Sequence, residues 1–335
     1  MIVLFSMKFD YATSAVMEWL HAYGAHVVRI NRDDHTYRLS SITSDGIYFE
    51  NRRSGQIINL SEAKACWWRR EGISNHCIFE SAPERLVAGG LDLTALRNSK
   101  QRDESTAILN YIRKRLLLEC PVHLGDPFVT ELNKLIVLDL AKTCGFKTPH
   151  YTIFTHVNQL PTAAPGATNR FVSKAIYEGM YDVVDNHRLY SFTEELEPDC
   201  LEAGPLFPSV AMELVEKEFE IRSFFLNGQF YSSAVFSQSS AQTQVDFRKY
   251  NQSKPNRVEP FILPDVVADK LRRMCHELGL NCASADIIVD KDNEYVFLEI
   301  NPVGQYHMVS DPCNYNLDHI IANYLMHGRR ETTSL

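Results

Sequence analysis

The sequence predicts a mixed α/β (α+β) fold, with a small parallel-sheet domain first and antiparallel sheets after it. Residues 2–6 are an apolar run, residues 12–23 repeat apolar side chains at helical spacing, and residues 25–30 are a second apolar run. A β-α-β order of this kind is typical of a parallel sheet covered by helices. Farther along, residues 219–226 and 230–236 flank Asn227-Gly228, a strong hairpin signal. We therefore expect the second half of the chain to be antiparallel.

After the β-α-β opening, short strands alternate with turns. Asp45-Gly46 and Ser54-Gly55 are typical hairpin turns. The residues expected in strands are 37–42, 46–50, 56–60 and 65–70, and those in a helix are 104–118. A break with Gly and Pro at residues 124–127 then indicates the first domain boundary.

The remaining elements follow the same signals. Helices are expected at residues 133–144, 265–278 and 316–325, strands at 151–154, 170–176 and 209–215, and hairpins at 177–192 and 285–302. We predict three domains, 1–123, 124–208 and 209–335, which suits a length of 335 residues.

Composition and charge exclude several classes of protein. The net charge of −8 disfavours non-specific nucleic-acid binding. The first ten residues lack the basic flank and long apolar core of a secretion signal, and no apolar run is long enough to span a bilayer. Eight cysteines without a CxxC pair favour reduced thiols. We expect a cytoplasmic protein with no membrane partner.

Three oxygen donors recur in the hairpin at 285–302. Asp286 lies in its first strand, and Glu299 and Asn301 lie in its second. Oxygen ligands without Cys or His suit a hard cation such as Mg²⁺. A surface hairpin with scattered acids is the alternative, and this stretch alone leaves both open.

Charged residues inside other strands suggest a phosphate site. Lys174 lies in the predicted strand 170–176, where burial requires an anionic partner, although the side chain could simply face solvent. Glu220 and Arg222 lie on one face of a strand and could form an ordinary ion pair. Arg248, taken alone, is consistent with a solvated loop.

The order of these parts resembles that of the ATP-grasp ligases across nearly the whole chain. The resemblance is carried by EKEFEIR in one strand and LEINP at the end of a later one. It implies an N-terminal α/β domain followed by central and C-terminal antiparallel-sheet domains that hold ATP between them. It also implies two Mg²⁺ ions held by Asp286, Glu299 and Asn301.

The resemblance further implies roles for the other candidates. Arg222, Arg248 and Lys174 match the catalytic cations around the reacting phosphates. The nucleotide-binding positions that it implies are Lys134, Lys174, Met212, Glu213, Leu214, Val215, Glu220, Arg248 and Asn251. In this set, residues 212–215 match the hinge at the adenine edge, and Glu220 matches the acid on the ribose hydroxyls.

Within this superfamily the chain is similar to the peptide maturases that form ω-ester or ω-amide rings, the graspetide enzymes of the microviridin and grasp-with-spasm groups. WWRR, LGDP and Ser237-Gln238 carry this likeness. It implies a precursor peptide with a leader and a core containing Asp or Glu and Thr, Ser or Lys, and the homodimer that is common among related maturases. A ligase that adds glutamate or another amino acid, and a peptide-binding module without catalysis, are the alternatives.

Overall fold

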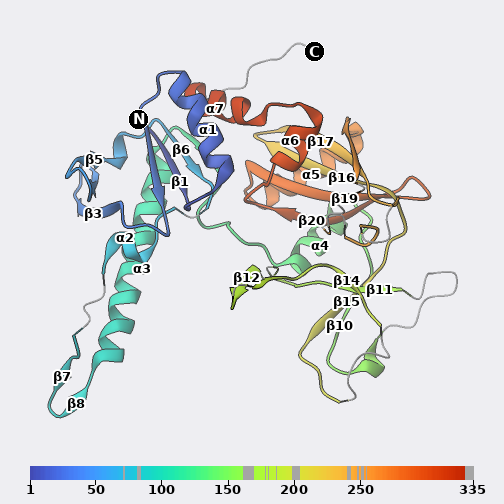
Figure 1. The fold of residues 1–335 in the computed structure, drawn as a ribbon, viewed down its shortest axis with the longest axis horizontal. Helices are drawn as coiled ribbons and strands as arrows, with labels where there is room; N and C mark the ends of the chain where they lie inside the picture. Colours follow the sequence, from blue (N-terminus) through green and yellow to red (C-terminus); the bar gives the residue numbers. More distant parts are fainter. Residues whose placement is uncertain are drawn as a thin grey trace. The chain divides into compact units, whose positions relative to one another are not determined.

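The computed structural model describes residues 1–70, 72–80, 84–160, 170–177, 179, 181–185, 187–197, 204–239, 243–246, 249, 253 and 255–328 (Figure 1). The chain forms two compact units. One unit combines Met1–Thr130 with Asn316–Leu335, and the other is Glu131–Tyr315. The final helix thus lies with the first unit, although the sequence prediction placed it in the last domain. The division into three domains stays a prediction.

A parallel sheet with strand order β2-β1-β6-β9 forms the centre of the first unit. Its strands are β1 (Ile2–Ser6), β2 (Val27–Asn31), β6 (Ala65–Trp68) and β9 (Val122–Leu124). The predicted β-α-β opening is confirmed by α1 (Tyr11–Ala22) between β1 and β2. Asp10 begins this helix because its carboxylate accepts a hydrogen bond from the Thr13 amide at 2.9 Å. The helix buries Val16 and Leu20 in the unit.

The predicted strands of the N-terminal region also form. They are β3 (Tyr37–Ile42), β4 (Ile47–Asn51) and β5 (Ile57–Asn59), an antiparallel meander, and the 3₁₀ helix η1 (Leu60–Glu62) follows. Two short elements, α2 (Asn75–Ile78) and the hairpin β7 (Val87–Ala88) with β8 (Leu91–Asp92), were not predicted. The helix α3 (Thr94–Glu119) is longer than the predicted 104–118.

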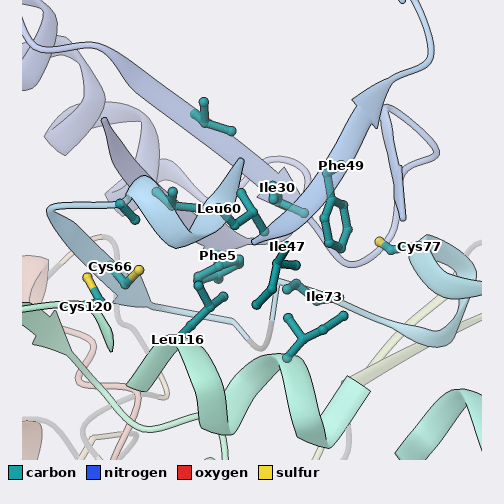
Figure 2. Packing of buried hydrophobic residues seen from close by; sticks show 14 of the residues in the cluster. Phe5, Ile30, Ile47, Phe49, Leu60, Cys66, Ile73, Cys77, Leu116 and Cys120 are labelled. Carbon is teal, nitrogen blue, oxygen red and sulfur yellow. The ribbon is translucent and has the colours of Figure 1, made fainter. Parts of the chain in front are cut away.

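The core of the first unit lies between α3 and these strands. Phe5, Ile47 and Leu116 belong to one cluster of buried side chains (Figure 2). Leu116 comes from α3, Phe5 from the parallel sheet and Ile47 from the meander, so this cluster joins all three parts. The last helix, α7 (Leu317–His327), packs on α1, where the His319 and Trp19 rings lie edge to face at 4.9 Å.

The second unit begins with α4 (Lys134–Thr143), whose N-terminus is capped by the Asn133 side chain. A four-stranded sheet follows in the order β10-β15-β11-β14, with antiparallel pairing between neighbouring strands. Its strands are β10 (Tyr151–Phe154), β15 (Ser209–Glu213), β11 (Phe171–Ser173) and β14 (Glu194–Glu195), and η2 (Val157–Gln159) is a 3₁₀ helix. The predicted hairpin at 177–192 is confirmed by β12 (Tyr181–Val184) and β13 (His187–Tyr190).

A five-stranded antiparallel sheet completes the second unit, in the order β18-β17-β16-β19-β20. The strands are β16 (Lys217–Leu226), β17 (Gln229–Phe236), β18 (Arg257–Phe261), β19 (Cys282–Asp290) and β20 (Tyr295–Asn301). Asn227 and Gly228 both have positive φ, as the predicted two-residue hairpin requires. The helix α5 (Asp265–Glu277) was predicted, whereas α6 (His307–Cys313) was not. No described helix is both long and apolar enough to cross a bilayer.

Candidate nucleotide and substrate site

One face of the five-stranded sheet carries the acids and the arginine that the sequence singled out. Arg222 on β16 lies directly opposite Asp286 on β19, and Asp286 lies opposite Glu299 on β20. Residues that face each other across strands share a sheet face, and so do residues two apart along a strand. Glu220 and Asn301 therefore join the other three on this face.

Two ion pairs cross this face. The Nη1 atom of Arg222 donates to both carboxylate oxygens of Asp286, at 2.9 and 2.8 Å. The Nζ atom of Lys174 donates to Glu299 Oε2 at 3.2 Å. The sequence predicted that Lys174 lies inside a strand. In the structure it directly follows the short strand β11. Its side chain is 13% exposed, so it is a largely buried cation held by an acid and not a solvated one.

Glu220 does not pair with Arg222, which was the ordinary interpretation of this strand. Its Oε1 atom accepts hydrogen bonds from Lys217 Nζ at 2.7 Å and from the Ser237 hydroxyl at 2.9 Å. Oε2 accepts no hydrogen bond from the described residues. Burial raises the pKa of the Glu220 carboxyl, while the Lys217 ammonium and the Ser237 hydroxyl lower it and the neighbouring Asp246 raises it.

A β-bulge explains why Lys217 reaches Glu220. Residues three apart on a regular strand point to opposite faces. The register with β19 shifts between Lys217 and Phe219, so Lys217 turns to the face of Glu220. A second bulge between Asp286 and Ile287 has a similar effect on β20. It leaves Glu299 on the site face and turns Phe297 to the other face, where Phe146 packs on it at 5.6 Å between ring centroids.

The predicted hinge lines a cavity beside this face. Met212, Glu213, Leu214 and Val215 border it together with Lys174, Glu220, Asp286 and Glu299. Its volume is about 80 Å³. Pockets that enclose whole drug-sized ligands measure roughly 300–1,000 Å³, so this cavity encloses only part of a ligand of that size.

The hinge backbone is partly engaged. The amide of Leu214 donates to the Arg170 carbonyl at 3.0 Å, and the amide of Glu213 donates to the His150 carbonyl at 2.8 Å. The Glu213 carboxylate accepts from the His150 amide at 3.3 Å. Among the described residues, the amide of Val215 has no hydrogen-bond partner, so it is the donor that this segment offers to a ligand.

Other predicted residues lie elsewhere or outside the described part of the chain. Lys134 Nζ donates at 2.8 Å to the carbonyl of Ala175, the residue that follows Lys174, and Lys134 is not among the residues that line the cavity. Arg248 and Asn251 lie outside the described residues.

Two charged residues of the cavity wall, Lys217 and Asp246, were not predicted as site residues from the sequence. Lys217 is buried, and only the bulge puts it on the site face. Asp246 is 4% exposed, lines the cavity and accepts a hydrogen bond from the Thr193 amide at 3.0 Å. The sequence offered no periodicity around Asp246, because it belongs to an irregular polar segment.

The predicted metal ligands fit Mg²⁺ in their donor chemistry. Asp286 and Glu299 are carboxylates on adjacent strands, and Asn301 adds an amide oxygen that accepts from the Val303 amide at 2.9 Å. Hard oxygen donors are those that Mg²⁺ prefers. No cluster of three or more His, Cys, Asp or Glu residues suited to a metal occurs among the described residues. A site on this face therefore rests on two acids, an amide and further oxygens from a bound phosphate or water.

A second cavity, of about 630 Å³, opens on the same face of the sheet. Its wall includes Arg222 of β16, Val235 of β17, Val258 of β18 and His307 of α6. Asp286 borders the first cavity and its partner Arg222 borders the second. The Arg222–Asp286 ion pair thus stands between the two cavities.

Arg222 has donor capacity to spare. Its side chain is 8% exposed, and only Nη1 is bound to Asp286. The Nε atom is buried and has no hydrogen-bond partner in the described part of the chain. A buried donor without a partner costs about 1–3 kcal/mol, which an incoming oxyanion would recover.

Solved structures similar to this chain match nearly its whole length. A RiPP-associated ATP-grasp ligase of Chryseobacterium gregarium, in complex with ADP and a leader and core peptide, is 21% identical, with a TM-score of 0.76 over 98% of this chain and 97% of that one. The macrocyclase MdnC of Microcystis aeruginosa MRC, bound to the precursor peptide MdnA, is 20% identical, with a TM-score of 0.71 over 98% and 100%.

A third structure is the ATP-grasp ligase PsnB with a variant of its minimal precursor, Mg and ADP. It is 18% identical and has a TM-score of 0.67 over 97% of both chains. No protein-family model and no curated protein matches the sequence. The structural likeness confirms the predicted architecture: the chain has the ATP-grasp fold.

Proposed function

We propose that this chain, with the fold of the ATP-grasp ligases, uses ATP to close rings in a ribosomally made precursor peptide. The observation that carries the proposal is the single sheet face on which buried cations, carboxylates and two cavities lie together. The likeness over the full chain to ligases crystallised with nucleotide and precursor peptide supports it. The substrate carboxylates are the Asp or Glu side chains of the peptide, and the product is an ester of Thr or Ser or an amide of Lys.

Ring closure needs activation because a carboxylate has no good leaving group. Transfer of the γ-phosphoryl group of ATP to the carboxylate gives an acyl phosphate, from which phosphate leaves readily. Phosphoryl transfer depends mainly on positioning and charge neutralisation. The protein therefore needs fixed cations beside the phosphates and a dry place for the acyl phosphate.

Lys174 and Arg222 are the described cations suited to this role. Both are largely buried, and both now hold carboxylates, Glu299 and Asp286. A triphosphate in the first cavity offers them oxyanions in place of those acids. We assign Lys174 to the nucleotide phosphates and Arg222 to the reacting phosphate at the boundary of the second cavity. Arg248 completes this positive field in the proposal, and Asn251 adds a neutral amide group to the binding of the nucleotide.

Asp286, Glu299 and Asn301 are the residues that would hold Mg²⁺. Bound there, the metal supplies positive charge to phosphate oxygens and orients them. Asp286 and Glu299 lie opposite each other on paired strands, so strand pairing and not a loop holds both acids on one sheet face. These acids bind metal and are not the acids that are activated.

The adenosine end of the nucleotide fits the hinge side of the first cavity. The Val215 amide offers a donor to the adenine edge, and the carbonyls and side chain of residues 212–215 offer acceptors. The Oε2 atom of Glu220 is available for a ribose hydroxyl, because Lys217 and Ser237 hold the other oxygen. Lys134 does not line this cavity itself; it donates a hydrogen bond to the carbonyl of Ala175, whose sequence neighbour Lys174 lines the cavity.

A mass measurement tests the proposal. The purified protein is incubated with Mg-ATP and, as candidate precursors, the short peptides rich in Asp or Glu and in Thr, Ser or Lys that a search of the genes around its own identifies, and each peptide is analysed by mass spectrometry. Ring closure removes the mass of one water for each ring. A gain of one amino-acid residue identifies an amino-acid-adding ligase instead, and an unchanged peptide without ATP turnover identifies a binding module. Either outcome overturns the proposal.

A further inference from the structure

The second cavity contains chemistry that the activation of a carboxylate does not use. Its wall carries an imidazole, His307, and a carboxylate, Asp311, in addition to Arg222. Val235, Val258 and Met308 supply an apolar part of the same wall. Because Arg222 borders this cavity and its partner Asp286 borders the first one, a group that occupies the second cavity meets the reacting phosphate at Arg222.

His307 is held in place by packing. It is the first residue of α6, and its ring stacks on Tyr306, with centroids 4.5 Å apart and planes 30° apart. Tyr306 is fully buried and packs on Phe224 of β16 at 5.1 Å. Phe224 lies on the same sheet face as Arg222, two residues away, so one strand positions both the arginine and the support of the imidazole.

The turn before α6 fixes this arrangement further. Gly304 has a φ of +62°, and a Cβ atom there would lie 2.9 Å from the Phe224 ring. The backbone thus approaches Phe224 as closely as glycine allows. Asp311 follows His307 by one helical turn, on the same side of α6, and also lines the cavity.

We propose that the second cavity receives the nucleophile of the ring closure, that this nucleophile is a Thr or Ser hydroxyl, and that His307 takes its proton. The proposal rests on the proposed function and deepens it. As the hydroxyl oxygen forms its bond to the acyl carbon, the O–H proton passes to the imidazole. The bond between the acyl carbon and the phosphate oxygen then breaks, and phosphate leaves with the electron pair. The product is an ester, and the imidazolium returns its proton to phosphate or water.

The surroundings favour a hydroxyl over an amine. A neutral hydroxyl is a weak nucleophile, and removal of its proton by a positioned base typically accelerates its attack 10²–10⁴-fold. A lysine nucleophile arrives as a cation and loses its proton before it attacks, so it gains less from a base in the cavity. Its positive charge would also be repelled by the Arg222 guanidinium on the same wall. The apolar side chains beside His307 suit the methyl group of threonine.

The test separates activation of the carboxylate from ring closure. The variants are His307→Gln, which removes the ring, and His307→Phe, which keeps an aromatic ring on Tyr306 but no base. His276→Gln, on the exposed side of α5, is the matched control. Each protein is given Mg-ATP and the precursor peptide, with and without hydroxylamine, which traps acyl phosphates as hydroxamates. Thermal unfolding and nucleotide binding show that the variants are folded.

Both His307 variants should form hydroxamate within a few-fold of the unsubstituted protein and close rings about a hundred-fold more slowly or worse. The control should match the unsubstituted protein in both assays. Precursors with every Thr and Ser replaced by Ala should form no ring, whereas Lys→Arg precursors should still cyclise.

Three results would overturn the inference. The first is ring closure at the normal rate in both His307 variants. The second is an equal decrease in the rates of hydroxamate formation and ring closure in these variants, and the third is ring closure that is lost in the Lys→Arg precursors. The first result means that the departing phosphate takes the proton itself. A failure of the proposed function looks different, because the unsubstituted protein then forms neither hydroxamate nor ring.

Discussion

The pair formed by Lys217 and Glu220 gives a sharp stability prediction. Both side chains are at most 10% exposed, and Lys217 Nζ lies 2.7 Å from Glu220 Oε1. Lys217→Met keeps the volume of the side chain and removes the charge, which leaves a buried carboxylate with only Ser237 as donor. Breaking a buried ion pair in this way costs about 3–5 kcal/mol.

Protonation of Glu220 sets the upper limit of this cost. From an ordinary value of 4.5, protonating a carboxyl at pH 7 costs about 3–4 kcal/mol, and at pH 5 it costs less than about 1 kcal/mol. Burial already raises the pKa of Glu220, and loss of Lys217 raises it further. A carboxyl with a raised folded-state pKa stabilises the fold below its ordinary value and loses that contribution as pH rises. We therefore expect Lys217→Met to lower the free energy of unfolding by about 3 kcal/mol at pH 7 and by about 1 kcal/mol or less at pH 5.

The assay has to report on the sheet that contains the pair. All three tryptophans, Trp19, Trp67 and Trp68, lie in the first unit, so their fluorescence does not follow the second. Hydrogen exchange of peptides from β16 and β19 at increasing urea, at pH 5 and pH 7, follows the sheet directly. The double variant Lys217→Met/Glu220→Gln should recover most of the loss at pH 7. An equal loss at both pH values, or a double variant as unstable as the single one, would show that the charge of Glu220 is not what destabilises Lys217→Met.

Three further predictions concern the site and its supports. Glu299→Gln should still fold cooperatively, because an amide oxygen can accept the hydrogen bond from Lys174 Nζ, and it should lower ATP-dependent product at least about a hundred-fold; ordinary turnover would remove Glu299 from the metal site. Gly304→Ala should lower stability by about 1–2 kcal/mol, because a residue with a Cβ atom is strained at φ +62° and meets a ring; an unchanged melting temperature contradicts this. Asp10→Asn should cost about 1–3 kcal/mol, equally at pH 5 and pH 7. Burial raises the pKa of Asp10, but Arg69 and Thr13 lower it, and the net result is a pKa below the ordinary value of 3.8. The ionised carboxylate therefore contributes its full stabilisation at every pH above 3.8. A loss of stability that differs between pH 5 and pH 7 contradicts this.

The sequence predicted the regular parts of the fold because their signals are local. Asn227-Gly228 specifies a two-residue turn, and the strands on either side pair as that turn requires. The β-α-β opening forms as its apolar periodicity indicates. The missed helix α6 has only seven residues and contains Pro312, so it is too short for an apolar repeat at helical spacing to identify it.

The site was less predictable because bulges and long-range pairing define it. Glu220 and Arg222 suggested a partnership along one strand, whereas Lys217 and Asp286 are their actual partners. A bulge at residue 218 puts Lys217 on the site face, and strand pairing across 64 residues puts Asp286 opposite Arg222. The second cavity depends on α6 and could not be inferred from the sequence.

In the proposed reaction, one ATP is spent to activate each carboxylate that closes a ring. The most direct test counts ADP and water in the same reaction, by coupled assay and by mass spectrometry of the peptide. We predict one ADP released for each water lost, no ADP release without the peptide beyond a low background, and neither product in Glu299→Gln. Loss of water without ATP, or steady ADP release with a peptide of unchanged mass, would rule out ring closure through an ATP-activated carboxylate.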